Sequence, residues 1–325
     1  MMDPAANFAD RLIAAAKAKQ TCVVVGLDPR LAQIPRQLQD AARKTAGSGP
    51  EGVAQCILEF NRRITDAVAE FAVAVKPQIA FYEPYGAAGI QCFIDTIRHA
   101  HAAGLLVIAD VKRNDIGSTA EAYAAAYLGS TPLWDEAEFC AFDADAVTVN
   151  AYLGSDGVRP FVETAKANGK GLFVLVKTSN ESSGELQDLQ VRDAEGTEGQ
   201  TIFEHVGALV KQWGVGVVGD EGYSSVGAVV GATYPEQGKI LRRMLPGVPF
   251  LVPGYGAQGA TAADVAHCFD ADGLGAVVNS SRGIIFAYQQ DEYAERFGEA
   301  RFAEAAAVSA QQTRDEINEA LAAGG

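Results

Sequence analysis

Short runs of β-branched and other apolar residues recur along the chain, and segments rich in Ala, Glu, Lys and Arg separate most of them. Eight such runs span Thr21–Asp28, Ala72–Ile79, Leu105–Lys112, Asp145–Asn150, Leu172–Thr178, Val226–Ala232, Phe250–Gly254 and Gly275–Ser280. Each run is almost continuously apolar, which is typical of strands that are buried on both faces. The pattern therefore predicts eight buried strands that alternate with helices.

Eight alternating units favour a closed (β/α)8 barrel, and an open doubly wound sheet is the competing fold. The first strand-to-helix turn reads Gly26-Leu27-Asp28-Pro29-Arg30, without the GxGxxG that opens dinucleotide-binding sheets. We therefore expect residues 1–325 to form a single (β/α)8 barrel (TIM barrel) domain with extra helices at both ends.

The flanking segments complete this predicted domain. Phe8–Lys19 is predicted to be a helix with Asn7 as its N-cap, placed to cover the barrel floor. The tail Asp291–Ala323 is predicted to be a helix outside the barrel. Thr45–Gly52 is expected to be a loop or insertion, and the polar stretch Asn180–Gln200 is where a mobile active-site loop could sit.

Composition narrows the function. The chain has 325 residues with 48 % hydrophobic and 21 % charged residues and a formal net charge of −15. A chain without a basic surplus is not expected to bind nucleic acid or anionic membranes, so an anionic ligand needs a local positive site. Five dispersed cysteines without a CxxC pair indicate reduced thiols and a cytoplasmic location. Neither a signal peptide in Met1–Asp10 nor a membrane-spanning segment is expected.

The candidate chemistry is concentrated in Asp110-Val111-Lys112-Arg113-Asn114-Asp115, directly after an apolar strand. Side chains alternate along a strand, so Asp110 and Lys112 are expected on one face at its carboxyl end. Asp115 follows in the loop. Buried charges are costly unless they are paired, and catalytic sites are where such cost is tolerated. The block predicts an acid–base apparatus.

Other polar residues stand at predicted strand ends, where a (β/α)8 barrel carries its catalytic face. They are Asp28, Lys76, Asn150, Lys177-Thr178-Ser179, Gln258 and Arg282. We interpret Asn150 and Lys177, each taken alone, as solvated rim residues. Lys76 is different, because a charge inside the apolar pattern VAVKPQI has no inexpensive structural explanation.

The last two strands predict a phosphate site. The turn Pro253-Gly254-Tyr255-Gly256-Ala257-Gln258-Gly259 is expected to present free backbone N–H groups before a helix, and Arg282 follows the eighth strand. Backbone donors, helix N-termini and guanidinium groups bind phosphate at this position in many barrels. A glycine-rich turn is more often structural, but together with Arg282 it indicates a phosphorylated ligand.

The blocks DVKRNDIGST, GLDPR, KPQIAFYE, PGYGAQG and NSSRGI resemble the orotidine 5′-phosphate decarboxylase family, and the second and third resemble its longer bacterial subfamily. The match runs from about Phe8 to Ile284. The Asp-x-Lys-x-x-Asp block also occurs in a wider superfamily and becomes specific together with Lys76 and the phosphate loops. The resemblance implies cofactor-free decarboxylation of orotidine 5′-phosphate to UMP and CO2, the last step of UMP biosynthesis.

The resemblance also implies residue roles. Asp28 binds the ribose hydroxyls, and Lys76 bridges the ribose and Asp110. Asp110 stands beside the substrate carboxylate, while Lys112 delivers a proton to C6 of the pyrimidine. Asp115 reaches across a homodimer interface into the partner's site.

The remaining implied contacts concern binding. Thr119 and Ser179 match positions that touch the pyrimidine, and Ile116 lines the pocket for the leaving CO2. Gln258 and Arg282, with Gly256 in the same turn as Gln258, hold the phosphate. The segments Thr45–Gly52 and Asn180–Gln200 are longer than in compact relatives, so the closing loop and the base contacts near Ser179 stay open.

Two alternatives are weighed. A metal-dependent barrel of the same superfamily, such as a hexulose-phosphate synthase or a keto-gulonate-phosphate decarboxylase, needs a divalent cation near the end of the second strand. Lys76 occupies that place, and one cation there disfavours another. A non-catalytic phosphate- or nucleotide-binding barrel would leave the array of Asp110, Lys112 and Asp115 without purpose. We expect no metal and no cofactor.

Overall fold

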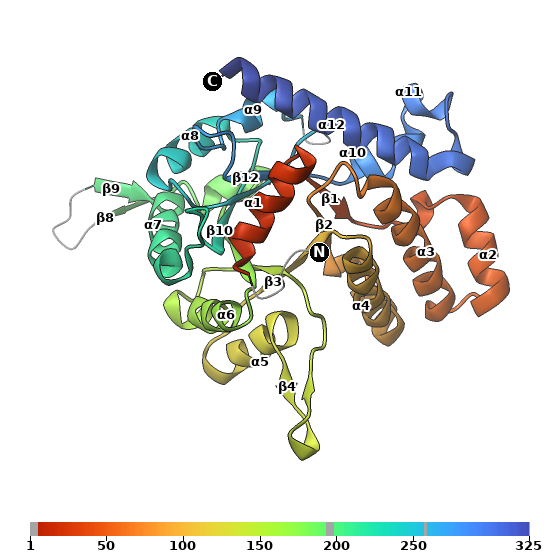
Figure 1. Cartoon of the computed structure of the whole chain (residues 1–325), viewed down its shortest axis with the longest axis horizontal. Helices are drawn as coiled ribbons and strands as arrows, with labels where there is room; N and C mark the ends of the chain where they lie inside the picture. The colour runs from red at the N-terminus through yellow and green to blue at the C-terminus, as the bar shows by residue number, and fades with distance from the viewer. Residues whose placement is uncertain (1–5, 193–197, 257–258, 325) are drawn as a thin grey trace.

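A computed structural model describes residues 6–192, 198–256 and 259–324, and within them eight parallel strands close into a barrel (Figure 1). The strands are β1 (Val23–Leu27), β2 (Ala74–Pro77), β3 (Leu106–Arg113), β6 (Ala146–Val149), β7 (Gly171–Lys177), β10 (Val226–Val230), β11 (Phe250–Pro253) and β12 (Ala276–Ser280). Around the barrel they follow the chain, and β12 closes on β1. The predicted (β/α)8 barrel is confirmed, and each predicted run overlaps one of these strands.

Helices surround the barrel (Figure 1). They are α1 (Phe8–Lys19), α2 (Arg36–Ala46), α3 (Pro50–Val68), α4 (Gly86–Ala102), α5 (Gly117–Leu128), α6 (Ser155–Ala167), α7 (Ile202–Gly214), α8 (Pro235–Met244), α9 (Ala262–Ala266), α10 (Arg282–Ile285), α11 (Asp291–Ala294) and α12 (Phe302–Gly324). None of the helices in the described ranges combines the length and apolar character that a membrane crossing requires.

The apolar core has two layers, inside and outside the barrel wall. Strand residues that point inward form the inner layer, which includes Val24, Leu106, Phe173 and Leu251. The alternate strand residues pack outward against the helices in a larger cluster. This alternation follows from the two-residue period of a strand. The inner layer fills the barrel, so a ligand can enter only at an end.

Helix α1 closes the amino-terminal end of the barrel, as predicted. Its N-cap Asn7 accepts a hydrogen bond from the Ala9 backbone N–H over 2.8 Å. Phe8 packs edge-on against Phe173 inside the barrel, with ring centroids 6.0 Å apart. Gly171, the first residue of β7, leaves the room for this contact, because a Cβ there would sit 2.1 Å from the Phe8 ring. The opposite, carboxyl end of the strands remains for a site.

Two predicted segments differ from the structure. Thr45–Gly52 is not an extended loop: Thr45 and Ala46 end α2, Gly47 turns the chain at φ +81°, and α3 begins at Pro50. Proline at a first helical position is favourable because no N–H is needed there. The tail is not one helix, because α11 and a 3₁₀ turn at Glu299–Arg301 precede α12. Gly298, at φ +58°, lies between α11 and this 3₁₀ turn.

Two small hairpins leave the barrel body in Figure 1. One pairs β4 (Thr131–Pro132) with β5 (Glu138–Phe139), and the other pairs β8 (Gln190–Arg192) with β9 (Glu198–Thr201). The second hairpin and a 3₁₀ helix at Glu181–Glu185 occupy the stretch Asn180–Gln200, of which residues 193–197 lie outside the described part. Both terminal helices are present, while the prediction of a single domain over residues 1–325 stays a prediction.

Candidate active site

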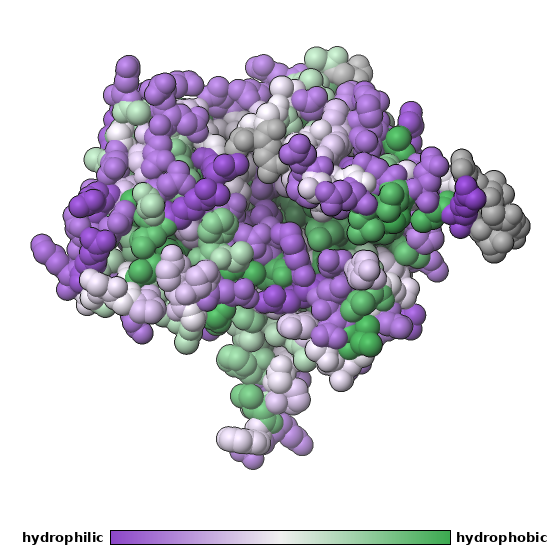
Figure 2. All heavy atoms as spheres, turned by 180° about the vertical axis from the view of Figure 1, so that it is seen from behind, coloured by the Kyte–Doolittle hydropathy of each residue, from purple (hydrophilic) through white to green (hydrophobic). Residues whose placement is uncertain are grey.

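The carboxyl ends of the strands surround a cavity of about 520 Å³. Figure 2, which views the molecule from the side opposite α1, shows this face hollowed near its centre. The lining residues come from the strand ends and from the loop after β7: Lys76, Asp110, Lys112, Thr148, Leu175, Thr178, Ser179, Asn180, Ser182, Ser183, Leu186, Gln187, Val229, Leu251 and Pro253. The structure thus brings four predicted site residues, Lys76, Asp110, Lys112 and Ser179, around one cavity.

The carboxylate of Asp110 is the centre of the site. Lys76 Nζ lies 2.6 Å from one oxygen, Oδ2, and Lys112 Nζ lies 2.6 Å from the other, Oδ1. Gln78 Nε2 donates to Oδ2 over 2.9 Å, and Thr148 Oγ1 donates to Oδ1 over 2.9 Å. Asp110 is 6 % exposed and Lys76 5 %. Four donors therefore fix one buried carboxylate in a single orientation.

A local break in β3 turns Lys112 toward this carboxylate. Lys112 has φ +46°, in the left-handed region, and the pairing of β3 with β6 shifts between Ala109 and Arg113. The hydroxyl of Thr148 accepts hydrogen bonds from the backbone N–H groups of Val111 and Lys112, each over 3.0 Å. A left-handed backbone at a residue other than glycine is costly, and such strain concentrates at functional sites. We predicted from strand alternation that Asp110 and Lys112 share one face. The two side chains do meet, but the left-handed backbone at Lys112 brings them together, and regular alternation does not include it.

Burial and the neighbouring charges act in opposite directions on these groups. Burial by itself raises the pKa of Asp110, but the adjacent Lys76 and Lys112 ammonium groups lower the pKa of that carboxyl well below its usual range. Burial lowers the pKa of Lys76, and the charges of Asp110 and Asp28 more than offset it, so that pKa is raised. The buried pair is therefore ionised at neutral pH. The Lys112 side chain, 47 % exposed, faces the cavity from its open side.

Asp28 follows β1 and lies close enough to Lys76 to act on its charge. Its Oδ1 is buried and has no hydrogen-bond donor among the described residues. A buried acceptor without a donor is costly, so this oxygen is suited to a ligand that brings its own donor. A sugar hydroxyl is such a donor.

Asp115, Ile116 and Thr119 do not line the cavity of their own chain. Asp115 accepts a hydrogen bond from the Ile116 backbone N–H over 2.8 Å, and Ile116 is 53 % exposed. Thr119 is exposed in the first turn of α5. The loop after β3 carries Ile116 and Thr119 away from the cavity of their own chain. Whether they contact a substrate in the pocket of a partner subunit stays a prediction. The prediction that Asp115 crosses to a partner stays a prediction.

The predicted phosphate loops are supported in part. Arg282 begins α10, is exposed, and its guanidinium makes no hydrogen bond or ion pair with the described residues. The glycine turn does not offer all the free N–H groups that we expected: Gly256 N–H donates to Ala260 O over 3.0 Å, and Gly259 N–H donates to Gly256 O over 2.8 Å. The turn satisfies these donors internally. Gln258 lies outside the described residues.

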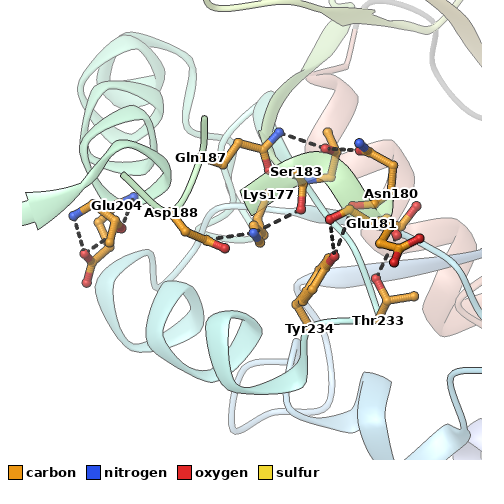
Figure 3. A network of polar contacts seen from close by, with 12 residues as sticks. Lys177, Asn180, Glu181, Ser183, Gln187, Asp188, Glu204, Thr233 and Tyr234 are labelled. Carbon is orange, nitrogen blue, oxygen red and sulfur yellow. Dashed lines mark hydrogen bonds and ion pairs between the residues drawn. The ribbon is translucent and has the colours of Figure 1, made fainter. Parts of the chain in front are cut away.

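Lys177 contradicts its prediction as a solvated rim residue. It is fully buried, and Figure 3 shows its ammonium directed at Ser183 and Asp188 of the loop after β7. Its Nζ lies 2.7 Å from Asp188 Oδ1 and donates to Ser183 Oγ over 3.1 Å. The strand shifts register here, pairing Val230 with Lys177, so the lysine does not line the cavity. Sequence alone could not show this, because the partners come from a loop of irregular structure.

Two further residues of the site were not predicted. Thr148 occupies the inward polar position in the apolar run Asp145–Asn150, and Gln78 stands two residues after Lys76. Residues two apart on a strand share a face, so this spacing was the available signal. Both were overlooked because neutral polar residues near strand ends are common. In the structure they complete the donor set of Asp110.

The fold and the site together define a class: (β/α)8 barrel enzymes whose acid–base groups stand at the carboxyl ends of the strands. The model of the orotidine 5′-phosphate decarboxylase / HUMPS family matches residues 21–297. The chain belongs to this family. Because the matched span runs from just before β1 to beyond β12, it includes every strand of the barrel.

Named relatives cover almost the whole chain. The orotidine 5′-phosphate decarboxylase of Rhodopirellula baltica is 45 % identical over 96 % of this chain and 99 % of its own. The orotidine 5′-phosphate decarboxylase of Caldicellulosiruptor bescii is 41 % identical over 97 % of this chain and 99 % of its own. Among solved structures, the OMP decarboxylase of Leishmania donovani superposes with a TM-score of 0.71 and 31 % identity, covering 97 % of this chain and 99 % of that one.

Proposed function

We propose that this chain decarboxylates orotidine 5′-phosphate to UMP and CO2, the last step of UMP biosynthesis. The observation that carries the proposal is the Asp110 carboxylate held between the ammonium groups of Lys76 and Lys112, at 2.6 Å each, beside the cavity. The carboxylate holds the Lys112 ammonium, a proton donor, at the cavity. The carbanion that decarboxylation leaves at C6 requires such a donor.

The proposed reaction balances without a cofactor. The bond between C6 and the carboxylate breaks, its electron pair stays on C6, and CO2 leaves. Lys112 stabilises the developing carbanion by its charge and then gives a proton from Nζ to C6, which yields UMP. The lysine regains its proton from solvent, toward which it is partly exposed. Lys76 and Gln78 keep Asp110 in place during these steps.

Magnitudes indicate which effect dominates. Two like charges about 4 Å apart, such as Asp110 and the substrate carboxylate, repel by roughly 4 kcal/mol at an effective dielectric of 20. Large enzymatic accelerations correspond to ~20 kcal/mol. Repulsion therefore supplies a minor share. The larger share comes from stabilisation of the carbanion by Lys112 and from phosphate binding energy used to close the site.

The binding roles follow the placement of the side chains. Asp28, with its unpaired buried oxygen, accepts from a ribose hydroxyl. Ser179 lines the cavity on the side of the loop after β7 and contacts the pyrimidine. Arg282, which has no protein partner among the described residues, binds the phosphate, together with Gln258 and the turn at Gly256.

We further propose a homodimer in which Asp115 completes the partner's site. The support is geometric: within one chain Asp115 does not pair with Lys112, and Ile116 next to it is exposed although it is apolar. An exposed apolar residue beside a functional carboxylate fits a covered interface. Ile116 and Thr119 then enter the partner's pocket together with Asp115.

A cytoplasmic location is the last part of the proposal. It is supported by the cysteines, all of them free and four of the five buried (Cys22, Cys56, Cys92 and Cys268). Buried free thiols fit a reducing compartment.

A metal-dependent barrel of the same superfamily was the alternative weighed above, so the test includes a chelator. Purified protein is mixed with orotidine 5′-phosphate and excess chelator, and the ultraviolet absorbance of the orotate group is followed. We expect the absorbance to fall at the rate seen without chelator. A chelator-sensitive rate would favour the metal-dependent alternative, and persistent absorbance under both conditions would reject decarboxylation of this substrate.

A further inference from the structure

We propose that Lys177 is a positioning residue, which holds the wall segment (Thr178–Asp188) against the barrel and so sets where Ser179 meets the substrate base. The wall segment contributes seven of the residues that line the cavity: Thr178, Ser179, Asn180, Ser182, Ser183, Leu186 and Gln187. Lys177 itself does not line the cavity. Its effect on the substrate must therefore pass through this segment.

The ammonium of Lys177 has its polar partners in the wall segment. Ser183 Oγ lies 3.1 Å and Asp188 Oδ1 2.7 Å from Nζ, and the lysine is fully buried. The ring of Tyr234 lies beneath it, with the centroid 4.4 Å from Nζ. A buried charge without partners is strongly unfavourable. Displacing the wall segment would leave this charge without its anion, so the lysine favours one position of the segment.

Direct bonds within the segment carry this constraint to the cavity. The backbone N–H of Thr178 donates to Gln187 Oε1 over 2.9 Å, and Gln187 Nε2 donates to Thr178 Oγ1 over 2.8 Å. Thr178 Oγ1 in turn donates to Asn180 Oδ1 over 2.6 Å. The two ends of the segment are thus joined on either side of Ser179. Figure 3 shows Gln187 and Asn180 in the network of polar contacts near Lys177.

The connection after β10 holds the same segment from the other side. Tyr234 Oη donates to Asn180 O over 3.0 Å, and Thr233 Oγ1 donates to Ser179 O over 3.0 Å. Gly231 packs against the backbone of Ser179 so closely that a Cβ would sit 2.7 Å from its Cα. Lys177 and this connection therefore enclose Ser179 and leave its backbone one position.

The inference rests on the proposed contact between Ser179 and the pyrimidine. The test distinguishes a failure of that contact from a failure of the role of Lys177. Calorimetry measures the affinity of each variant for two ligands, UMP and ribose 5-phosphate, so the readout does not depend on turnover. Both ligands carry the sugar phosphate, and UMP alone carries the base. A misplaced wall segment weakens the binding of UMP and leaves the binding of ribose 5-phosphate unchanged. A general loss of structure weakens the binding of both ligands.

The decisive variant is Lys177→Met, which keeps an unbranched side chain only one atom shorter and removes its charge. We expect its dissociation constant for UMP to rise at least about fivefold, as for a lost hydrogen bond, while that for ribose 5-phosphate stays within about twofold. The matched control is Lys170→Met. Lys170 directly precedes β7, is largely buried and pairs with Asp143 over 2.9 Å at the other end of the strand. The control should bind both ligands like the native protein.

Tyr234→Phe decides the matter if Lys177→Met does not fold, because it removes only the hydroxyl that bonds Asn180 O. It should shift the UMP affinity in the same direction. The proposal would be overturned if the folded Lys177→Met variant bound UMP as tightly as the native protein. If Lys177→Met does not fold, the same result in Tyr234→Phe would overturn it. An equal loss of affinity for UMP and ribose 5-phosphate would also overturn it. If Ser179→Ala binds UMP with native affinity, the contact between Ser179 and the base is overturned instead. The role of Lys177 is then decided by whether Lys177→Met loses more affinity for UMP than for ribose 5-phosphate.

Discussion

Thr148 Oγ1 donates a hydrogen bond to Asp110 Oδ1 over 2.9 Å from the neighbouring strand. The same hydroxyl oxygen accepts the backbone N–H groups of Val111 and Lys112. One neutral side chain therefore orients the carboxylate and also stabilises the left-handed backbone that turns Lys112 toward it. The acid–base pair depends on a residue that carries no charge.

Thr148→Val should impair both functions of that hydroxyl. The shape is kept, but the backbone N–H groups of Val111 and Lys112 and one carboxylate oxygen lose a partner. We therefore expect the free energy of unfolding to fall by about 1–3 kcal/mol and kcat to fall with it. Urea unfolding and steady-state kinetics measure these changes. Thr96→Val is the matched control, a buried threonine that accepts one hydrogen bond from Asn61. Equal kcat values for the two variants would contradict the role of Thr148.

Lys112→Ala should abolish turnover and leave product binding intact. A general acid typically contributes about 10²–10⁴-fold, and here the same group also stabilises the carbanion, so the loss should be at the upper end or beyond. The orotate absorbance measures turnover, and calorimetry with UMP measures binding. Native turnover in this variant would remove the proposed chemistry. Loss of UMP binding together with turnover would indicate a damaged site.

Arg282→Ala should mainly weaken substrate capture. A hydrogen bond to a charged group contributes about 1.5–3 kcal/mol, so we expect KM to rise roughly 10- to 150-fold with a smaller effect on kcat. Arg159→Ala, at an exposed position of α6, serves as the control and should change neither constant. A lowered melting temperature with normal kinetics would assign Arg282 a structural role in place of phosphate binding.

Asp110 and Lys76 should determine opposite ends of the pH–stability profile. The pKa of Asp110 is lowered in the folded chain, so its contribution is present above the unfolded pKa of about 4 and is lost as the pH falls toward the folded value. The pKa of Lys76 is raised, so its contribution is present below about pH 10.4 and is lost as the pH rises through the folded value. Between these limits both groups stay ionised.

Asp110→Asn tests the acid limb. The variant leaves Lys76 buried without its anion, so the free energy of unfolding near neutral pH should fall by about 3–5 kcal/mol, and its decline below pH 4 should flatten. Asp145→Asn is the control, because Asp145 is a buried carboxylate at the barrel floor, away from the site. Burial raises the pKa of Asp145, but the hydrogen bond from His101 and the charges of His101 and Arg11 lower this pKa overall. Both variants should flatten the acid limb, whereas activity should be lost only in Asp110→Asn. An acid limb in Asp110→Asn as steep as in the native protein would contradict the ionised pair.

Subunit mixing tests whether Asp115 acts across an interface. Asp115→Asn and Lys112→Ala should each be inactive alone, and a mixed dimer should contain one site with both native residues. After equal mixing and exchange, half of the dimers are mixed, so roughly a quarter of the native activity should return. Ultracentrifugation checks the dimer. A mixture that stays inactive although mixed dimers form would place Asp115 in its own subunit's site.

The sequence by itself determined the barrel. Continuous apolar runs at regular spacing indicate strands buried on both faces, and eight of them with helices between can close only in a few ways. It also determined Asp110, Lys112 and Lys76, because a charge within such a run is too costly to be incidental. The helix limits at Asn7 and Lys19 were predictable for the same local reasons.

Tertiary structure decided the rest, because the deciding contacts join segments that no local pattern relates. Lys177 is buried through Asp188 and Tyr234, and the bend at Lys112 depends on Thr148 from the next strand. The turn at Gly256 bonds its own N–H groups, which a count of glycines cannot foresee. A sequence pattern reports which side chains seek burial, while the partners that make burial of a polar group possible are fixed only when distant segments meet.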